Sequence, residues 1–170
     1  ITIATLIVIA TKTLDVKDTK LTRQMINSSL LFMMQELEKT TMDLAWYDEA
    51  IQKIFIDKDL YWVDENYGKY LYHTYNIDAS FIVDKNGKTF ISYLKGKLVN
   101  LDAYQFIGND LVLLVDKAWH ETKGSRELYD GVRAPKPQSG FVLISGKPYI
   151  FSVCAFTPEE IDPVDLSEKK

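Results

Sequence analysis

The longest regular pattern of apolar positions in the chain is helical and covers residues 14–44, a stretch without Gly or Pro. Side chains recur there at the heptad spacing that keeps one seam of a helix against a partner: Ile26, Leu30, Met33, Leu37, Thr40 and Leu44. Residues 30–34 are apolar all round the helix, which implies burial on more than one side. The pattern predicts one long helix packed on its own core. Its other side either pairs with a second protomer in a parallel dimer or is buried within the same domain.

Two shorter helical segments follow, at residues 46–55 and 62–75. In the second of them, apolar and aromatic side chains fall on one stripe, formed by Val63, Tyr67, Tyr70, Leu71 and Tyr75. Asp57, Asp59 and the Lys between them interrupt the pattern, and such residues are suited to cap the start of the second segment.

From residue 78 onward the apolar positions alternate with a period of two. Strands are predicted at residues 78–84 and 88–94, because the Asn86–Gly87 turn between them is the strongest short hairpin signal. A second hairpin is predicted at residues 141–145 and 148–156.

The segment between the two hairpins is mixed. A helix is expected at residues 110–119, and residues 121–139 carry Gly, Pro, Lys and Arg and are interpreted as a long loop. Helices followed by two hairpins predict a single α+β domain over residues 1–170, with an antiparallel sheet within residues 78–156. The helix and loop between the hairpins are expected to cover one face of that sheet.

The first ten residues are almost wholly apolar, with Ile, Thr and Val predominant. A helix that crosses a bilayer needs about 20 apolar residues, so this run is too short to span one alone. It is either the outer end of a transmembrane helix or an extra β-strand. The sequence leaves both interpretations open.

Composition excludes several classes of protein. With 46% hydrophobic and 26% charged residues among 170, the chain is an ordinary globular domain. Its net charge of -4 argues against nucleic acid as a partner, because such proteins cluster Lys and Arg on one face. The chain has one cysteine, Cys154, so an internal disulfide is excluded. Because Cys154 lies in an apolar run, a buried thiol is expected.

Catalytic and metal-binding motifs are absent from the sequence. The two histidines, His73 and His120, are too few for a His-rich metal cluster, and no P-loop, zinc-protease helix, calcium loop or nucleophile elbow is complete. Paired acids such as Asp48–Glu49 lie on helical segments and are interpreted as solvated. We therefore expect no catalytic residues, no metal, no cofactor and no enzymatic activity.

Several motifs occur in the order found in a known family. The run DLAWYDEA at residues 43–50, with Trp46 and Asp48, is followed by the hairpin motif DKNG, from Asp84 to Gly87. Strand-like runs GFVLI and PYIFSV come later, from residues 140 and 148. Over residues 14–156 the chain thus resembles the fourth class of CHASE domains. Trp46 and Asp48 are interpreted either as a structural joint between long helix and sheet or as ligand contacts.

The resemblance implies a sensory domain outside the cytoplasmic membrane of a bacterium or archaeon, in a receptor anchored in the cell membrane. The output domain on the cytoplasmic side is then a histidine kinase, or an enzyme that makes or degrades cyclic di-GMP. The implied fold is Cache- or PAS-like, with a long helix and a five-stranded antiparallel sheet. Only four strands are counted between residues 78 and 156, and residues 157–170 show no closing strand. Residues 1–10 are a candidate to supply one.

The same resemblance places a small-molecule ligand between the sheet and the segment at residues 95–139. That segment carries more aromatic and basic residues than any other loop: Trp119, His120, Arg126, Tyr129 and Arg133. Two tyrosines on neighbouring strands, Tyr93 and Tyr149, are expected to face it. An arginine there suits a carboxylate, and an aromatic wall suits an apolar or cationic group. In the alternative interpretation, the aromatics are core and the arginines are solvated. The competing function is a dimerisation or protein-interaction domain that binds no small molecule. The sequence does not identify the ligand.

Overall fold

The computed structural model of the chain describes residues 2–8, 19–83, 88–124, 128–129 and 132–158. At residues 2–8, 19–22, 124, 128–129 and 132–133 it describes the backbone alone. The described residues combine a long helix near the N-terminus, shorter helices and an antiparallel sheet, which confirms the predicted α+β class.

The long helix is α1 (Thr19–Ala45), and residues 14–18, where we expected it to begin, lie outside the described residues. The two predicted shorter helices are present as two runs that each contain a π-helical section: α2 (Asp48–Ile51) with η1 (Gln52–Ile56), and α3 (Leu60–Val63), η2 (Asp64–Lys69) and α4 (Tyr70–Tyr75). Asp59 caps α3 by accepting a hydrogen bond from the backbone N–H of Trp62 at 3.0 Å, as the polar break indicated.

A six-stranded antiparallel sheet forms the centre of the domain, in the order β4-β3-β2-β1-β8-β7. Its strands are β1 (Thr2–Val8), β2 (Ala79–Val83), β3 (Thr89–Leu94), β4 (Lys97–Val99), β7 (Gln138–Ile144) and β8 (Lys147–Ala155). The pairs β2–β3 and β7–β8 are the two predicted hairpins. β1 lies between them and pairs with both β2 and β8. The predicted turn from Asp84 to Gly87 lies outside the described residues.

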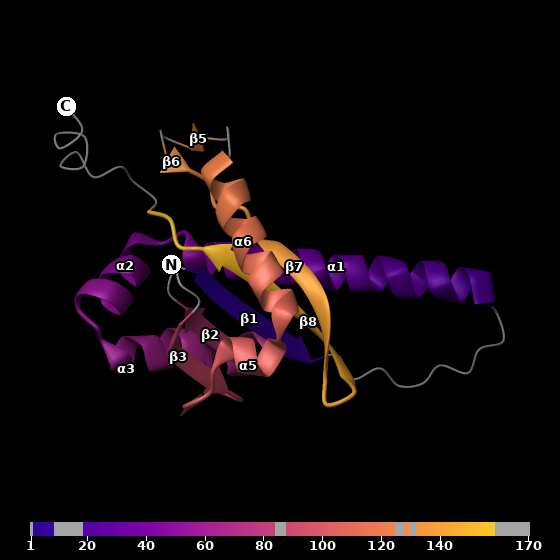
Figure 1. Cartoon of the computed structure of the whole chain (residues 1–170), viewed down its shortest axis with the longest axis horizontal. Helices are drawn as coiled ribbons and strands as arrows, with labels where there is room; N and C mark the ends of the chain where they lie inside the picture. Colours follow the sequence, from indigo (N-terminus) through magenta and orange to yellow (C-terminus); the bar gives the residue numbers. More distant parts are fainter. Residues whose placement is uncertain (1, 9–18, 84–87, 125–127, 130–131, 159–170) are drawn as a thin grey trace.

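Both faces of the sheet are covered by helices, with α6 (Asn109–Gly124) in front and α1 behind in Figure 1. Strand β8 shows how one strand serves both layers. Ile150 and Cys154 belong to the core under α1 to α4, whereas Phe151 and Val153 belong to the core under α5 (Ala103–Ile107) and α6. Since successive side chains of a strand point to opposite faces, burial on both faces explains the nearly continuous apolar run of β8.

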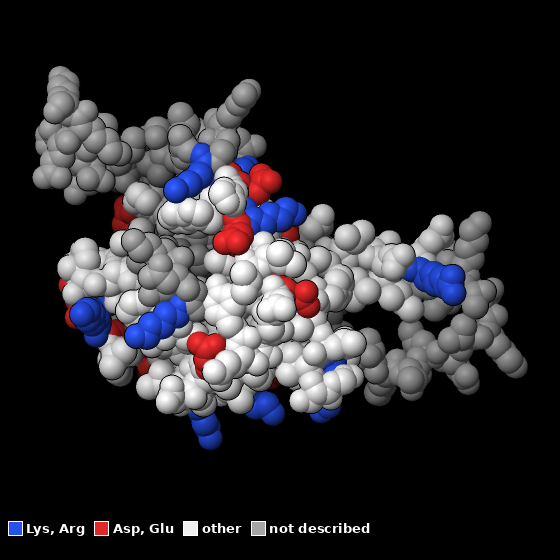
Figure 2. Space-filling model, viewed as in Figure 1, with Lys and Arg blue, Asp and Glu red and all other residues white. Residues whose placement is uncertain are grey.

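The N-terminal half of α1 extends beyond the sheet, as Figure 1 shows. Leu37 is buried in the core, but Met25, Leu31 and Phe32 are exposed by 64%, 60% and 63%. In Figure 2 the visible part of this helix is almost free of charge apart from a basic group near its far end. None of the helices among the described residues is long and apolar enough to cross a bilayer.

The segment between the hairpins is more ordered than its sequence suggested. Our count of four strands between residues 78 and 156 was wrong, because β4 adds a fifth strand to the central sheet there and β5 and β6 form a separate pair. A three-residue strand is too short to show a period of two. Within the predicted loop at residues 121–139, α6 continues to Gly124, and β5 (Leu128–Tyr129) pairs with β6 (Val132–Arg133).

Candidate functional site

The predicted ligand residues on the strands lie on opposite faces of the sheet. Tyr93 is 2% exposed, and its ring packs against Gly68 in the core under α1. Tyr149 packs in the other core, under α5 and α6. The expectation that both face one site is therefore wrong for this pair. The face on which a strand residue lies depends on register between strands that are distant in sequence, and no local pattern fixes that register.

The remaining predicted residues lie on or after α6. Trp119 and His120 are both exposed, and the Lys123 ammonium stacks on the Trp119 ring at 4.6 Å from its centroid. Tyr129 and Arg133 are in the β5–β6 pair, where the backbone alone is described, and Arg126 lies outside the described residues. The described side chains of the predicted set thus do not line one cavity, and a ligand role for any of them stays a prediction.

Trp46 joins the end of α1 to the chain that leaves β8. Its indole Nε1 donates to the carbonyl oxygen of Pro158 at 3.0 Å, and the Thr157 N–H donates to the Ala45 carbonyl at 3.1 Å. Asp48 is the first residue of α2, directly after this contact. These hydrogen bonds favour the structural interpretation of the Trp46 motif, because they connect two segments that are far apart in sequence.

A pocket of about 440 Å³ lies between the helical run and the edge of β3, and we call it the η1–β3 pocket. Its volume falls within the usual range for small-molecule sites. Apolar side chains form nearly all of its wall: Ile54, Phe55, Leu60, Val63, Phe90 and Ile91, with Lys58 as the one charged residue among them. Ile54 and Val63 are 6% and 1% exposed and form its buried end, whereas Leu60 and Phe90 are 57% and 59% exposed.

Three of the segments that line the η1–β3 pocket are locally irregular: η1, the residue Lys58 and the start of β3. η1 is a π-helix, a rare form that is frequent at functional sites. Lys58 has φ of 54°, in the left-handed region that few residues other than Gly adopt. The β2–β3 pairing passes from Ile82–Ile91 to Val83–Thr89, so that Phe90 is the extra residue of a β-bulge. In a regular strand Phe90 and Ile91 would point to opposite faces, and the bulge lets both line the pocket.

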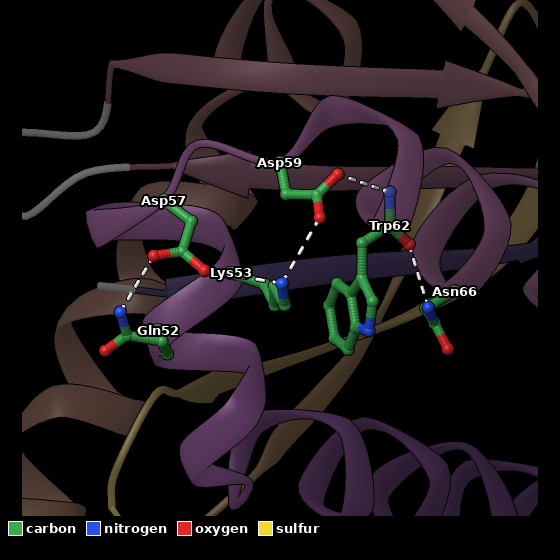
Figure 3. Close-up of polar contacts among 6 residues, drawn as sticks. All are labelled: Gln52, Lys53, Asp57, Asp59, Trp62 and Asn66. Atoms are coloured by element: carbon green, nitrogen blue, oxygen red, sulfur yellow. Dashed lines mark hydrogen bonds and ion pairs between the residues drawn. The ribbon is translucent and has the colours of Figure 1, made fainter.

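A network of polar contacts holds the helical wall of the pocket, as Figure 3 shows. The Lys53 ammonium lies 3.4 Å from an Asp57 carboxylate oxygen and 3.3 Å from an Asp59 oxygen. The second oxygen of Asp57 accepts from the Gln52 amide at 2.8 Å, and that of Asp59 accepts from the Trp62 N–H. The hydrogen bonds that the Lys53 ammonium donates to the Asp59 and Asp57 carboxylates raise the pKa of Lys53, and the hydrogen bond from the Trp62 N–H is the main cause of the lowered pKa of Asp59. All four carboxylate oxygens are thus engaged.

Lys58 lies between these two aspartates in sequence but takes no part in their ion pairs. In the part of the chain that the structure describes, its ammonium has no carboxylate partner, while Lys53 has two. From the sequence, the Asp57–Asp59 segment was predicted only to cap a helix. The signal available there was a lysine between two helical segments in a stretch rich in apolar residues. In the structure two of these apolar residues, Ile56 and Tyr61, are exposed by 64% and 76%.

A second, more open groove of about 290 Å³ runs beside α1. Phe32, Met33 and Leu37 of α1 line it together with Tyr75 and Ile77. Phe32 and Met33 of this wall also belong to the exposed apolar surface of α1, so the groove is part of that surface. Among the described residues, no group of three or more His, Cys, Asp or Glu side chains is arranged to hold a metal ion.

Comparison with known proteins identifies the family. None of the curated proteins matches the sequence. The sequence model of the CHASE4 domain matches residues 29–164, which include α1 from its middle onward, the helical run, both hairpins and the Trp46 motif. This match covers most of the chain and confirms the resemblance based on Trp46, Asp48 and the first hairpin. The chain belongs to the CHASE4 family, whose members are extracytoplasmic sensory domains of membrane receptors.

Proposed function

We propose that this domain is the ligand-sensing input module of a transmembrane receptor, with the η1–β3 pocket as its binding site. The observation that supports this most directly is the pocket itself, an apolar cavity of about 440 Å³ lined by one lysine, Lys58, that has no carboxylate partner among the described residues. The covalently linked output domain is a histidine kinase or a cyclase or phosphodiesterase of cyclic di-GMP, as the family implies.

The connections of the pocket suit a sensor. η1 follows α2 directly, and α2 begins two residues after Trp46. Trp46 in turn links the end of α1 to the exit of β8 through Pro158. A ligand that changes the packing of Ile54 or Phe55 therefore acts only one short helix, α2, away from the Trp46 contact. At that contact the end of α1 meets the chain that leaves β8. This short path is how we expect occupancy to be transmitted to the ends of the domain.

We propose further that the receptor dimerises through the N-terminal half of α1. Of the heptad positions, Leu30, Leu37 and Leu44 pack on the domain's own core, while Ile26 and Met33 are 40% and 37% exposed. One half of the seam thus has a partner within the domain and the other half lacks one among the described residues. A parallel copy of the same helix suits this stripe, because heptad positions pair with themselves across a parallel seam.

A pair of matched variants tests the pocket. Leu60→Trp replaces a leucine side chain at the mouth of the η1–β3 pocket by the larger indole ring. Leu98→Trp makes the same change on β4 at a residue of nearly equal exposure, since Leu60 is 57% and Leu98 58% exposed. Small molecules bound to the purified protein are identified by mass spectrometry after denaturation. We expect Leu60→Trp to lose them and Leu98→Trp to retain them. Equal retention by both variants contradicts the assignment of the pocket.

The second candidate function is a dimerisation domain that senses no small molecule, and the exposed stripe of α1 favours it. Ile26→Glu puts a charge on that stripe, and Val112→Glu makes a matched change at a residue of α6 with the same exposure, 40%. Light scattering at micromolar concentration should show dimers for the parent and for Val112→Glu, and monomers for Ile26→Glu. Dimers, together with a protein that carries no ligand and is not stabilised by any, support this second function.

A further inference from the structure

The charge distribution around the η1–β3 pocket indicates which chemical class of ligand it takes. On the basis of the proposed sensor function, we infer that the pocket binds a small amphipathic monoanion, a carboxylate on an apolar body. Lys58 is the residue that holds the carboxylate. The apolar body lies towards Ile54 and Val63, and the charged group lies at the mouth.

The ion pairs beside the pocket leave Lys58 as the available cation. Asp57 and Asp59 flank it in sequence, and either would neutralise it if its oxygens were free. Instead Lys53 binds one oxygen of each, while Gln52 and the Trp62 N–H occupy the other two. Both carboxylates turn towards Lys53 in Figure 3. An anion from solution therefore supplies the partner that Lys58 lacks among the described residues.

The backbone conformation of Lys58 fits this role. A left-handed φ of 54° costs free energy for a residue with a Cβ atom, and Asn or Gly adopts it more readily than Lys. Such conformations persist where the surrounding structure fixes them, and they are common at ligand-binding positions. Here the end of η1 on one side and the Asp59 cap of α3 on the other hold the residue in place. The residue that they hold in this conformation is the one that lines the pocket.

The rest of the wall determines what the anion is attached to. The other residues that line the pocket are aliphatic or aromatic, so they gain from burying a hydrocarbon or aryl group and offer no side-chain partner for a second polar group. A lysine acts as a single point charge and suits one carboxylate, whereas phosphate esters usually require several donors or an arginine fork. A cationic ligand would meet the Lys58 ammonium, which none of the described carboxylates neutralises.

Calorimetry with four probes of similar size tests the inference: hexanoate, phenylacetate, hexylamine and 1-hexanol. We expect the two carboxylates to bind and to raise the melting temperature, and hexylamine to do neither. Lys58→Asn keeps a residue that tolerates positive φ but removes the charge, so it should weaken carboxylate binding on the order of tenfold. Lys58→Arg should retain it. Added salt should weaken binding to the parent but not to Lys58→Asn.

The matched control is Lys95→Asn, because Lys95 is also exposed and also left-handed, with φ of 51°, but lines a different pocket. Binding that is lost equally in Lys58→Asn and Lys95→Asn overturns the inference, as does carboxylate binding that Leu60→Trp leaves unchanged. If hexylamine or 1-hexanol binds as well as hexanoate and Leu60→Trp abolishes that binding, the ligand class is wrong while the sensor function stands. If none of the probes and no co-purified molecule depends on Leu60, both proposals fail.

Discussion

Gly68 packs against the Tyr93 ring in the core under α1 and leaves no room there for a Cβ atom. A Cβ atom at Gly68 would lie 2.6 Å from both Cδ1 and Cε1 of the Tyr93 ring and 3.3 Å from its Cγ. Neither side can retreat easily. The Tyr93 ring is 2% exposed, and the Ser80 hydroxyl binds η2 to β2 by donating to the Tyr67 carbonyl oxygen at 2.6 Å. Substitution by alanine must therefore displace a buried ring or a buried helix.

The expected cost of Gly68→Ala combines two opposing effects. Overpacking of a dense core costs about 1–3 kcal/mol, and a fixed aromatic ring places this site in the upper half of that range. Alanine in a helix regains up to about 1 kcal/mol relative to glycine. The net loss of stability is then about 1–2 kcal/mol. For a domain of this size that loss corresponds to a fall in melting temperature of about 2–8 °C.

Calorimetry or urea unfolding measures this loss, with Gly140→Ala as the control. At Gly140 the nearest atom to a new Cβ is Cδ1 of Leu114, at 2.8 Å, and the end of a leucine side chain can rotate away. Gly140→Ala should therefore cost less than Gly68→Ala. In a Tyr93→Leu background the Gly68→Ala change should cost less than in the parent, because the ring is gone. A Gly68→Ala protein as stable as the parent, or strict additivity of the two changes, would refute the reasoning.

Three further predictions concern Cys154, Trp46 and Asp59. Burial raises the pKa of the Cys154 thiol, so a thiol-specific reagent at pH 8 should react slowly with the native protein and rapidly in denaturant; equal rates would contradict its burial. Trp46→Phe removes the hydrogen bond to Pro158 and should lower stability in urea by about 1 kcal/mol, whereas an unchanged midpoint would show that this bond contributes nothing. Asp59→Asn should lower the melting temperature at pH 7 but not at pH 2. The Asp59 pKa is lowered in the folded state, so its contribution is present above about pH 4 and is lost as the pH falls through the folded pKa.

The elements that the sequence predicted correctly are those whose burial is periodic. Leu30, Leu37 and Leu44 follow the heptad, and all three pack in the core under α1. The strands β2 and β3 lie within one residue of their predicted limits, since apolar runs on both sides of an Asn-Gly turn leave little choice of pairing. The family was recognisable for a related reason. The Trp46 contact with Pro158 ties α1 to the sheet and requires a particular side chain at that position.

The elements that the sequence did not predict are short or depend on distant contacts. β4 has three residues, and two of them, Lys97 and Leu98, are exposed, so no alternation distinguishes it from a loop. α5 has five residues and is stabilised by Asp102, whose carboxylate accepts from the Gln105 N–H at 2.9 Å. That cap is visible in the sequence only once the helix is known, because Asp is equally common in turns.

The candidate pocket was missed because regular patterns cannot reveal it. Periodicity identifies positions where the backbone is ideal, and the η1–β3 pocket is formed where the backbone departs from ideality: the π-helix η1, the left-handed Lys58 and the bulge at Phe90. Each departure redirects side chains that a regular element would bury or expose by turns. A bulge makes Phe90 and Ile91 neighbours on one wall, and the αL residue ends one helix so that another begins at a new angle. A binding site of this kind is therefore predictable from sequence only after the fold has shown which elements are interrupted.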